Sequence, residues 1–314
     1  MRVIRHLSAR HPAPGDLKGA AVAIGNFDGV HLGHKAVIDR ARSYAEAHGL
    51  PLVVLTFEPH PRRLFQPDLP PFRLTPLRPK LVRFAQLGVD ASLVLRFDRT
   101  LAATTADAFV DRYLVESLGA RYVAIGENFR FGRGRAGTAS YLQARAAAAG
   151  FLVEAVPPQL SPEGEPYAST RIREHLEAGR PEAAAALLGR WFSIDGRIER
   201  GDQRGRQIGF PTANVALGSF LRPLRGGYAV FAELGGRRYQ AIANLGLRPT
   251  FGGLADRFEV HLFDFAGDIY GKRLCVDLVA YLRPEKKFSG LDELKAQIAA
   301  DSITTRRILS AAQP

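Results

Sequence analysis

The pattern of apolar residues changes once along the chain, near Leu188-Gly189-Arg190. Before this point, short apolar runs typical of strands alternate with segments of helical spacing that end at a glycine. After it, the runs are short, rich in β-branched and aromatic residues, and broken by Gly and Pro. Because the apolar residues follow a different spacing in each half, the halves need different folds, and we predict two domains, residues 1–187 and 188–314.

The first half predicts an α/β domain with a parallel sheet that is covered by helices on both faces. Strands separated by helical segments are joined by crossover connections, which place the strands parallel. Ligands of such sheets bind in the loops that follow the strands. The expected strands are 20–27, 52–57, 91–97, 121–125 and 151–156, and the expected helices are 33–48, 77–87, 105–118 and 139–149.

The second half predicts an antiparallel barrel or sandwich. Gly235-Gly236 marks a tight hairpin within it. A last helix is expected at 291–309, with Ser289 and Asp292 at the spacing of a capping box. The expected strands are 192–199, 226–234, 237–245, 258–265 and 272–282.

Composition limits the class of protein further. The chain is 46% apolar and 24% charged, values typical of a soluble globular protein. No apolar run reaches the length of a membrane span, and the N-terminus lacks the apolar core of a signal peptide, so we expect a cytoplasmic protein with no membrane partner. The single cysteine, Cys275, excludes an internal disulfide and a cysteine-based zinc site. The net charge of +12 suits an anionic partner, and the even spread of basic residues favours a phosphorylated small molecule over nucleic acid.

The segment GNFDGVHLGH, residues 25–34, joins an expected strand to an expected helix and is rich in groups that bind anions. The backbone N–H groups that begin a helix are unpaired and carry partial positive charge. Gly25 and the glycines after it let an anion approach this backbone. His31 and His34, three apart in the first turn, would point to the same side and add two donors. The segment therefore predicts a phosphate clamp, suited to a nucleoside triphosphate.

A second candidate site lies in the second half, where a loop rich in Gly and Arg leads into Gly-Phe-Pro-Thr-Ala-Asn. Such a loop suits a polyphosphate. Thr212 and Asn214, two apart on an extended segment, project to one side, and their oxygens suit Mg²⁺ bridged to phosphates. Glu259, on a later strand, is a candidate general base for a substrate hydroxyl. The loop residues expected to bind substrate are Arg206, Gly209, Phe210 and Pro211.

Both segments have simpler interpretations. The first is also compatible with a metal site of Asp28, His31 and His34, or with a glycine-rich turn that holds its histidines by chance. The second is also compatible with a β-hairpin that has a basic, solvated tip, with Glu259 facing water. The two segments taken separately do not decide between these interpretations.

Taken together, the motifs resemble a known family. GNFDGVHLGH is similar to the Gly-x-x-x-x-His-x-Gly-His signature of the nucleotidylyl transferase superfamily, in the form found in bifunctional riboflavin kinase/FAD synthetase. FEPHP at 57–61, GENFRFGRGRAG at 126–137 and STRIR at 169–173 agree with that family. The resemblance implies a Rossmann-like nucleotidylyl transferase domain that transfers AMP from ATP to FMN, giving FAD and pyrophosphate.

The resemblance also implies roles for residues of the first half. His31 and His34 would hold the ATP phosphates, and Ser169, Thr170 and Arg173 would form a second phosphate-binding turn at a helix start. The residues implied to contact nucleotide or flavin are Gly25, Asn26, Asp28 and Asn128, with Phe57 and Phe129 either packed on the flavin ring or in the core. The family often has Ser-Ser-Thr and an upstream basic residue in this turn, where this chain has Ala168 and Pro166. We therefore expect a weaker or differently tuned FAD synthesis.

The second half resembles the riboflavin kinase module, a six-stranded barrel with a C-terminal helix. NLGLRPTF at 244–251, EVH at 259–261, DIYG at 268–271 and Leu282-Arg283 with Lys287-Phe288 occur in the expected order. The resemblance implies phosphorylation of the ribityl 5′-hydroxyl of riboflavin by Mg²⁺-bound ATP. Thr212 and Asn214 match the Mg·ATP positions and Glu259 the proposed base, while Arg283 and Phe288 would close over the flavin. His261 shares a strand face with Glu259 and is expected to face the opposite loop.

Two other functions compete with this one. One is an adenylyltransferase for pantetheine phosphate or a nicotinate nucleotide with an accessory β-domain, against which the GFPTAN segment and Glu259 count. The other is a non-catalytic basic protein whose barrel binds nucleic acid, which would need a series of exposed aromatic residues that the strands lack. The partners expected are thus ATP, riboflavin and FMN, with no nucleic acid, for a monomer or weak homo-oligomer.

Overall fold

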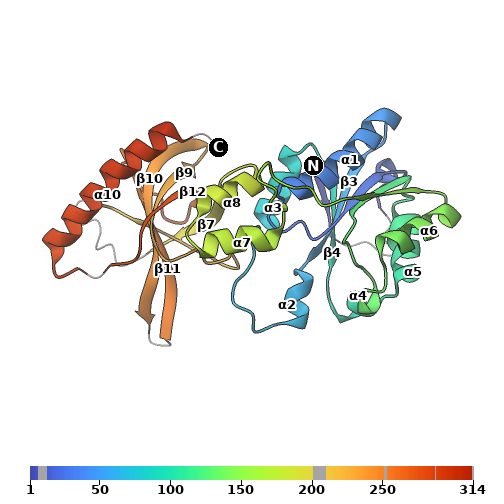
Figure 1. Cartoon of the computed structure of the whole chain (residues 1–314), viewed down its shortest axis with the longest axis horizontal. Helices are drawn as coiled ribbons and strands as arrows, with labels where there is room; N and C mark the ends of the chain where they lie inside the picture. Colours follow the sequence, from blue (N-terminus) through green and yellow to red (C-terminus); the bar gives the residue numbers. More distant parts are fainter. Residues whose placement is uncertain (6–12, 201–209, 251–252, 287, 313–314) are drawn as a thin grey trace. The chain divides into compact units, whose positions relative to one another are not determined.

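The computed structural model describes residues 1–5, 13–200, 210–250, 253–286 and 288–312 (Figure 1). Contacts divide the chain into two compact units. The first unit comprises Met1–Pro70 and Thr75–Ala168, and the second comprises Pro71–Leu74 and Ser169–Pro314. Each unit has its own sheet and its own apolar core.

The first unit is built on a parallel sheet, as predicted. Among the described residues its six strands follow the spatial order β1-β4-β3-β2-β5-β6. The order reverses beside β2, because β3 and β4 continue on one side of it and β5 and β6 on the other. Ligands of open α/β sheets bind at such a reversal, where the loops after neighbouring strands diverge. The strands are β1 (Arg2–Ile4), β2 (Ala21–Ile24), β3 (Leu52–Glu58), β4 (Ala91–Arg96), β5 (Tyr122–Gly126) and β6 (Leu152–Val156).

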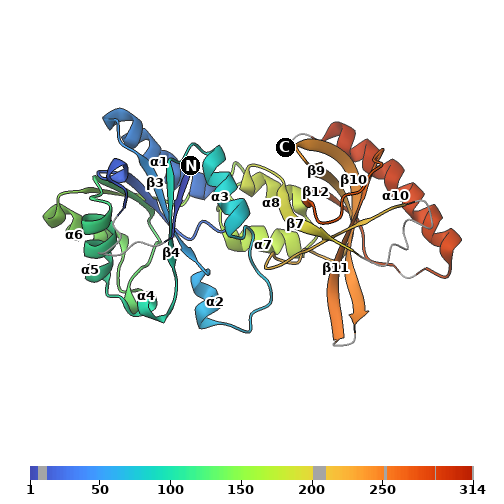
Figure 2. The same cartoon turned by 180° about the vertical axis from the view of Figure 1, so that it is seen from behind.

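Helices cover both faces of this sheet, because alternate strand residues are apolar on both sides. In β2, Ala21 and Ala23 pack with α1 and α3, whereas Val22 and Ile24 pack with α5, η2 and α6 on the other face (Figure 2). The helices are α1 (Leu32–His48), α2 (Pro61–Phe65), α3 (Leu77–Gln86), α4 (Arg99–Ala103), α5 (Ala106–Phe109), η2 (Val110–Ser117) and α6 (Ala139–Ala149).

Several details of the first unit differ from the sequence prediction, among them the short helices α2 and α4, which were not predicted. The helix expected at 105–118 is α5 followed by the π-helical segment η2, in which the Ser117 hydroxyl donates to the carbonyl of Arg112, five residues earlier. Strand β1 was not predicted, because three residues are too few to show a period. The remaining expected helices and strands are present with ends shifted by a few residues.

The second unit contains a closed antiparallel barrel, which decides between the barrel and the sandwich left open by the sequence. The barrel order is β10-β11-β8-β7-β12-β9. In β7 the residues alternate between the barrel interior and the outside, with Phe192, Ile194, Gly196 and Ile198 buried. The strands are β7 (Phe192–Glu199), β8 (Ala213–Val215), β9 (Gly226–Leu234), β10 (Arg237–Thr250), β11 (Gly253–Leu262) and β12 (Arg273–Arg283).

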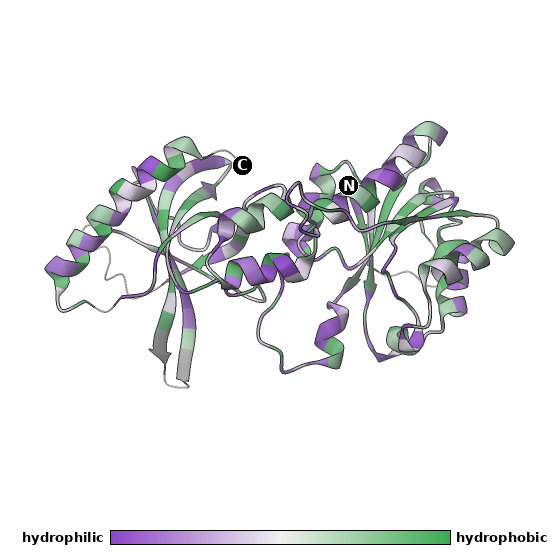
Figure 3. Ribbon diagram, viewed as in Figure 1, coloured by the Kyte–Doolittle hydropathy of each residue, from purple (hydrophilic) through white to green (hydrophobic). Residues whose placement is uncertain are grey.

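In the described part of the second unit the helices are α7 (Ser169–Glu177), α8 (Pro181–Leu188) and α10 (Leu291–Ala311). Helix α8 packs on β7 and β12, and α10 packs along β9, β10 and β12, where Ile308 and Leu309 join an apolar cluster with strand residues. Polar and apolar residues alternate along α10 (Figure 3). Gly290, not Ser289, caps α10, and Ser289 binds Glu293 rather than Asp292, so the predicted capping box is wrong.

The second unit includes more residues than the second domain predicted from the sequence. Residues 71–74 join it because Arg73 pairs with Ser219 and Leu221 through backbone hydrogen bonds of 3.2 and 2.8 Å. Residues 169–187 join it through α7 and α8. The domain boundary at 187/188 stays a prediction, because contacts alone do not define which segment folds independently. None of the described helices is long and apolar enough to cross a bilayer.

Gly196 is required by the close approach of β7 to the chain after β8. A Cβ there would lie 2.6 Å from Val215 Cγ1 and would overlap the Ala216 carbonyl. We expect Gly196→Ala to lower the free energy of unfolding of the barrel by about 2 kcal/mol or more, as overpacking does. Urea unfolding followed through the single tryptophan, Trp191, measures this. Gly227→Ala is the control, since its Cβ would lie 3.6 Å from the nearest atom; equal losses would contradict the explanation.

Candidate active sites

The turn that follows β2 has an unusual backbone conformation. Phe27 and Val30 adopt left-handed φ angles of 49° and 44°, and Gly29 lies between them at 95°. Bulky and β-branched residues rarely adopt this conformation, and such strain concentrates at functional sites. The surrounding structure must therefore hold the turn in place.

Buried polar groups supply that support. The Nζ of Lys80, which is fully buried, donates to the Asn26 carbonyl over 2.7 Å, and the Thr56 hydroxyl donates to the same oxygen over 3.2 Å. Asp28, also buried, accepts the backbone N–H of Thr75 through Oδ1 at 3.0 Å. Asp28 thus fixes the turn in addition to any contact with a nucleotide. Lys80 was missed by the sequence analysis, since a lysine in an amphipathic helix is usually a surface residue.

His31 and His34 lie together at the start of α1. Their rings stack with centroids 3.6 Å apart, and His31 Nδ1 caps the helix by accepting the backbone N–H of His34 at 3.3 Å. A neutral imidazole that accepts at Nδ1 carries its proton on Nε2, so Nε2 is a donor. With the partial positive charge of the helix N-terminus, this arrangement suits phosphate. Among the residues that the structure describes, no cluster of His, Cys, Asp and Glu could hold a metal ion, which disfavours the alternative metal site of Asp28 and the two histidines.

Aromatic residues gather at the carboxyl edge of the parallel sheet. Phe57, at the end of β3, is buried in the core, and it packs edge-on against Phe97, which follows β4. Phe65 of α2 also packs edge-on against Phe97 and is 68% exposed. Phe129, after β5, stacks on Phe131 at 5.8 Å. Phe57 is thus placed for packing, whereas Phe65, which the sequence analysis did not single out, offers an exposed aromatic face.

Other first-half candidates lie at strand and helix ends. Asn128 is exposed in the loop after β5, next to the loop after β2 because these strands pair in parallel. Ser169 and Thr170 form the first turn of α7, in the second unit. Arg173 of the same helix donates from Nε to the Phe72 carbonyl at 2.8 Å and lies over the Phe72 ring. The expected common site of this turn with the histidines stays a prediction.

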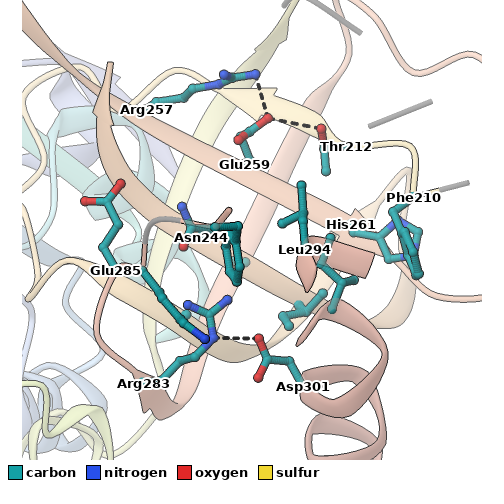
Figure 4. Close-up of a pocket in the computed structure, with 16 residues that line it drawn as sticks. Phe210, Thr212, Asn244, Arg257, Glu259, His261, Arg283, Glu285, Leu294 and Asp301 are labelled. Atoms are coloured by element: carbon teal, nitrogen blue, oxygen red, sulfur yellow. Dashed lines mark hydrogen bonds and ion pairs between the residues drawn. The ribbon is translucent and has the colours of Figure 1, made fainter. Parts of the chain in front are cut away.

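A pocket of about 300 Å³ opens in the second unit between the barrel and α10. Backbone register places Glu259 of β11 opposite Asn214 of β8 on one side and Asn244 of β10 on the other. The lining includes Phe210, Thr212, Asn244, Arg257, Glu259, His261, Arg283, Glu285, Phe288, Leu294 and Asp301 (Figure 4). The pocket thus gathers residues that are far apart in the sequence.

Thr212 and Glu259 lie at one wall of this pocket, and Arg257 links them to Asn214. Thr212 Oγ1 donates to Glu259 Oε1 at 3.2 Å. Arg257 contacts the same carboxylate oxygen through Nη2 at 2.6 Å and donates from Nε to Asn214 Oδ1 at 2.9 Å. Arg257 was not predicted; the signal for it is its position two residues before Glu259, which puts both on one strand face. Oxygen donors, a carboxylate and a guanidinium form a set suited to phosphoryl transfer.

The opposite wall joins β12 to α10. Arg283 Nε donates to Asp301 Oδ2 at 2.7 Å, and its guanidinium lies 5.8 Å from the Phe288 ring centroid (Figure 4). Asp301 is buried and was not predicted. At the rim, hydrogen bonds from Lys286 and Ser289 lower the pKa of Glu293 to about 2, so this carboxylate stays charged and holds the rim segment to α10. An aromatic ring and a guanidinium here suit a flat, polar ligand.

His261 contacts the loop opposite it, as expected. Its Nδ1 lies 2.8 Å from the Pro211 carbonyl, and its ring packs edge-on against Phe210. It therefore supports the segment that carries Thr212. The predicted substrate residues Arg206 and Gly209 lie outside the described residues.

Comparisons with known proteins match each half of the chain to a family. Residues 13–171 match the FAD synthetase family, and residues 188–309 match the riboflavin kinase family. The chain is 42% identical to the bifunctional riboflavin kinase/FMN adenylyltransferase of Escherichia coli K12, and the match covers 100% of both chains. It belongs to this bifunctional family.

More distant members and a solved structure extend the comparison. The bifunctional riboflavin kinase/FMN adenylyltransferase of Bacillus subtilis is 36% identical over 99% of both chains. A crystal structure from Streptococcus pneumoniae, named a macrolide-efflux protein, is 31% identical with a TM-score of 0.87 and covers 98% of this chain and 99% of its own. Family and fold are therefore shared over the whole length.

The glycine between the two histidines is explained by a close contact. A Cβ on Gly33 would lie 2.9 Å from the Tyr167 carbonyl oxygen and 3.2 Å from His31 Nδ1. We expect Gly33→Ala to shift the ring resonances of both histidines in NMR spectra and to lower stability by about 1–3 kcal/mol. Gly126→Ala, at the end of β5, is the control, because its Cβ would meet nothing within 4 Å. Unshifted histidine resonances in Gly33→Ala would rule out the contact.

Proposed function

We propose that this chain makes FAD from riboflavin in two steps. It phosphorylates riboflavin with ATP to give FMN, and it then transfers AMP from a second ATP to FMN, giving FAD and pyrophosphate. The observation that carries the proposal is the cluster at the barrel pocket, where Glu259 accepts from Thr212 and Arg257 links it to Asn214, in a chain that matches both families in order. An adenylyltransferase for another substrate, with an accessory barrel, gives no reason for this cluster.

The first step takes place in the barrel pocket. The ribityl 5′-oxygen attacks the γ-phosphorus of ATP, the bond from this phosphorus to the β–γ bridging oxygen breaks, and ADP leaves. Glu259 accepts the proton of the hydroxyl. Arg283 and Phe288 hold the flavin on the opposite wall, and Phe210 and Pro211 border the nucleotide. The donor set fits Mg²⁺, because the Thr212 hydroxyl and the Asn214 amide offer hard oxygen ligands; bound there with ATP, the ion neutralises phosphate charge.

The second step takes place at the helix N-terminus that follows β2. A phosphate oxygen of FMN attacks the α-phosphorus of ATP, and pyrophosphate leaves. His31 Nε2, His34 and the backbone N–H groups of α1 stabilise the charge that develops on the phosphates. Ser169, Thr170 and Arg173 offer a second turn suited to phosphate at the start of α7. The residues proposed to border the nucleotide or flavin are Gly25, Asn26, Asp28, Asn128, Phe129 and Phe65.

The wider setting is proposed from the same chemistry. Small molecules alone serve as partners: ATP, riboflavin and FMN. The protein acts in the cytoplasm, as a monomer or weak homo-oligomer, without nucleic acid. Ala168 and Pro166 stand where the family often has a hydroxyl and a cation, so we expect FAD synthesis to be weaker or differently tuned than is usual in the family.

The direct test is incubation with riboflavin, ATP and Mg²⁺, followed by chromatographic separation of the flavins. FMN should form first and FAD after it, and FMN supplied alone should give FAD. An adenylyltransferase for pantetheine phosphate or a nicotinate nucleotide would produce neither flavin.

Substitutions should separate the two steps. We expect Glu259→Gln to slow FMN formation by about 10²–10⁴-fold, because the general base is lost, and to leave FMN-to-FAD conversion unchanged. We expect His31→Ala with His34→Ala to slow FAD formation by about 10²–10³-fold and to leave FMN formation unchanged.

The controls for these variants are residues of the same type outside the two sites. Glu233→Gln changes an exposed carboxylate of β9, and His48→Ala changes a histidine at the far end of α1. Neither should alter either rate. Loss of both reactions in a folded Glu259→Gln protein, or in the folded histidine double variant, would show that the two-site assignment is wrong.

A further inference from the structure

Arg257 connects the residues that we place in the phosphorylation chemistry. Its Nη2 lies 2.6 Å from Glu259 Oε1, and its Nε donates to Asn214 Oδ1 at 2.9 Å. Glu259 Oε1 also accepts from Thr212 Oγ1 (Figure 4). One guanidinium therefore contacts both the proposed base and a proposed Mg²⁺ ligand.

The partner of Arg257 sets it apart from the other basic side chains of the pocket. Arg283 and Lys286, which also line the described part of the pocket, pair with carboxylates of α10 that have no part in the reaction. Arg257 pairs with the carboxylate that has to take up the substrate proton. The pair holds Glu259 in place, and it also directs Oε1 toward the guanidinium rather than toward a substrate hydroxyl.

Binding of Mg·ATP would change the charges around this guanidinium. A divalent cation held by Thr212 and Asn214 would repel a guanidinium that contacts Asn214. The triphosphate would at the same time offer several anionic oxygens, which a guanidinium binds in bidentate fashion. The side chains of Arg257 and Glu259 are 25% and 24% exposed, so water reaches their pair and screens it. A triphosphate carries more negative charge than one carboxylate, so it attracts the guanidinium more strongly.

Given the proposed kinase reaction, we infer that Arg257 is a positioning residue that exchanges partners during the reaction. Without nucleotide it holds Glu259 and Asn214 in register. When Mg·ATP binds, its guanidinium passes to the phosphate oxygens and leaves Glu259 to accept the proton of the 5′-hydroxyl. Only the side chain has to move, because the backbone of Arg257 is fixed in β11 by its pairing with Gly246 of β10.

Steady-state kinetics of FMN formation distinguish this exchange from a fixed support. Arg257→Met removes the charge but keeps an apolar stem, and we expect it to raise the KM for ATP about tenfold. Arg257→Lys keeps the charge and should recover part of this loss. If the guanidinium only held Glu259 in place, its removal would lower kcat and leave the KM for ATP unchanged.

A matched control tests whether any lost guanidinium has this effect. Arg273→Met removes an arginine of β12 that pairs with Asp195 at 2.9 Å on the barrel wall, outside the pocket lining. Its KM and kcat should stay within about twofold of the parent protein, as expected for a surface ion pair. A tenfold rise in its KM for ATP would remove the support that Arg257→Met gives.

The side-chain Nε–H resonance of Arg257 gives a readout that does not depend on turnover. It is assigned by its loss from the ¹H–¹⁵N spectrum of Arg257→Lys. Adding Mg²⁺ with a non-hydrolysable β,γ-imido analogue of ATP should shift it, because Nε leaves Asn214 Oδ1. The Nε–H of Arg273, which donates to Asp195 Oδ1 at 2.9 Å, should not shift.

The outcomes separate the inference from the function on which it rests. If the parent protein forms no FMN from riboflavin, the proposed function is wrong, and the exchange with it. If FMN forms but the KM for ATP stays unchanged in Arg257→Met and the Arg257 resonance does not shift, only the exchange is wrong. A raised KM together with a shifted resonance supports it.

Discussion

The backbone pairing of β8 with β11 is the constraint on which the chemistry of the barrel depends. It places Asn214 directly opposite Glu259, so that an amide oxygen and a carboxylate share one face. A slip of β8 by one residue would turn Asn214 to the other face, away from Glu259, and the site would be lost. Closure of the barrel fixes this register, because every strand is hydrogen-bonded on both sides. Stability and function therefore rest on the same hydrogen bonds.

The first unit positions its site in a different way, through a turn under strain. Left-handed backbone at Phe27 and Val30 is held by the buried Lys80 and by Asp28, and it brings the chain into α1 with His31 as the cap. His31 thus has two roles. Its Nδ1 accepts a backbone N–H at the start of α1, and the tautomer that this requires carries the proton on Nε2, which can donate to a phosphate. Here the strain of the turn is offset by buried hydrogen bonds rather than by strand register.

The sequence predicted the features that show in the spacing of apolar residues and in the order of motifs. It missed the features that arise from contacts between residues far apart in the chain. Alternating strands and helices indicated the parallel sheet, and the family motifs led to Glu259, Thr212 and Asn214. The sequence gives no signal for the distant group that a charged side chain on a strand or helix contacts. It therefore missed Arg257, Asp301 and Lys80. The helix α8 was missed although Pro181 and Gly189 mark its two ends.

The contrast between the two sites follows from their nucleophiles. A ribityl hydroxyl is neutral at physiological pH and needs a base, and the barrel pocket supplies the carboxylate of Glu259 at the place where phosphate ligands gather. The phosphate of FMN is already anionic, since its second pKa lies near 6, so it needs no base. It needs hydrogen-bond donors that can bind the FMN phosphate and the ATP phosphates together. A helix N-terminus with stacked imidazoles supplies such donors, and in the turn GNFDGVHLGH the carboxylate of Asp28 accepts a backbone N–H instead. Each half of the chain thus carries the groups that its own nucleophile requires.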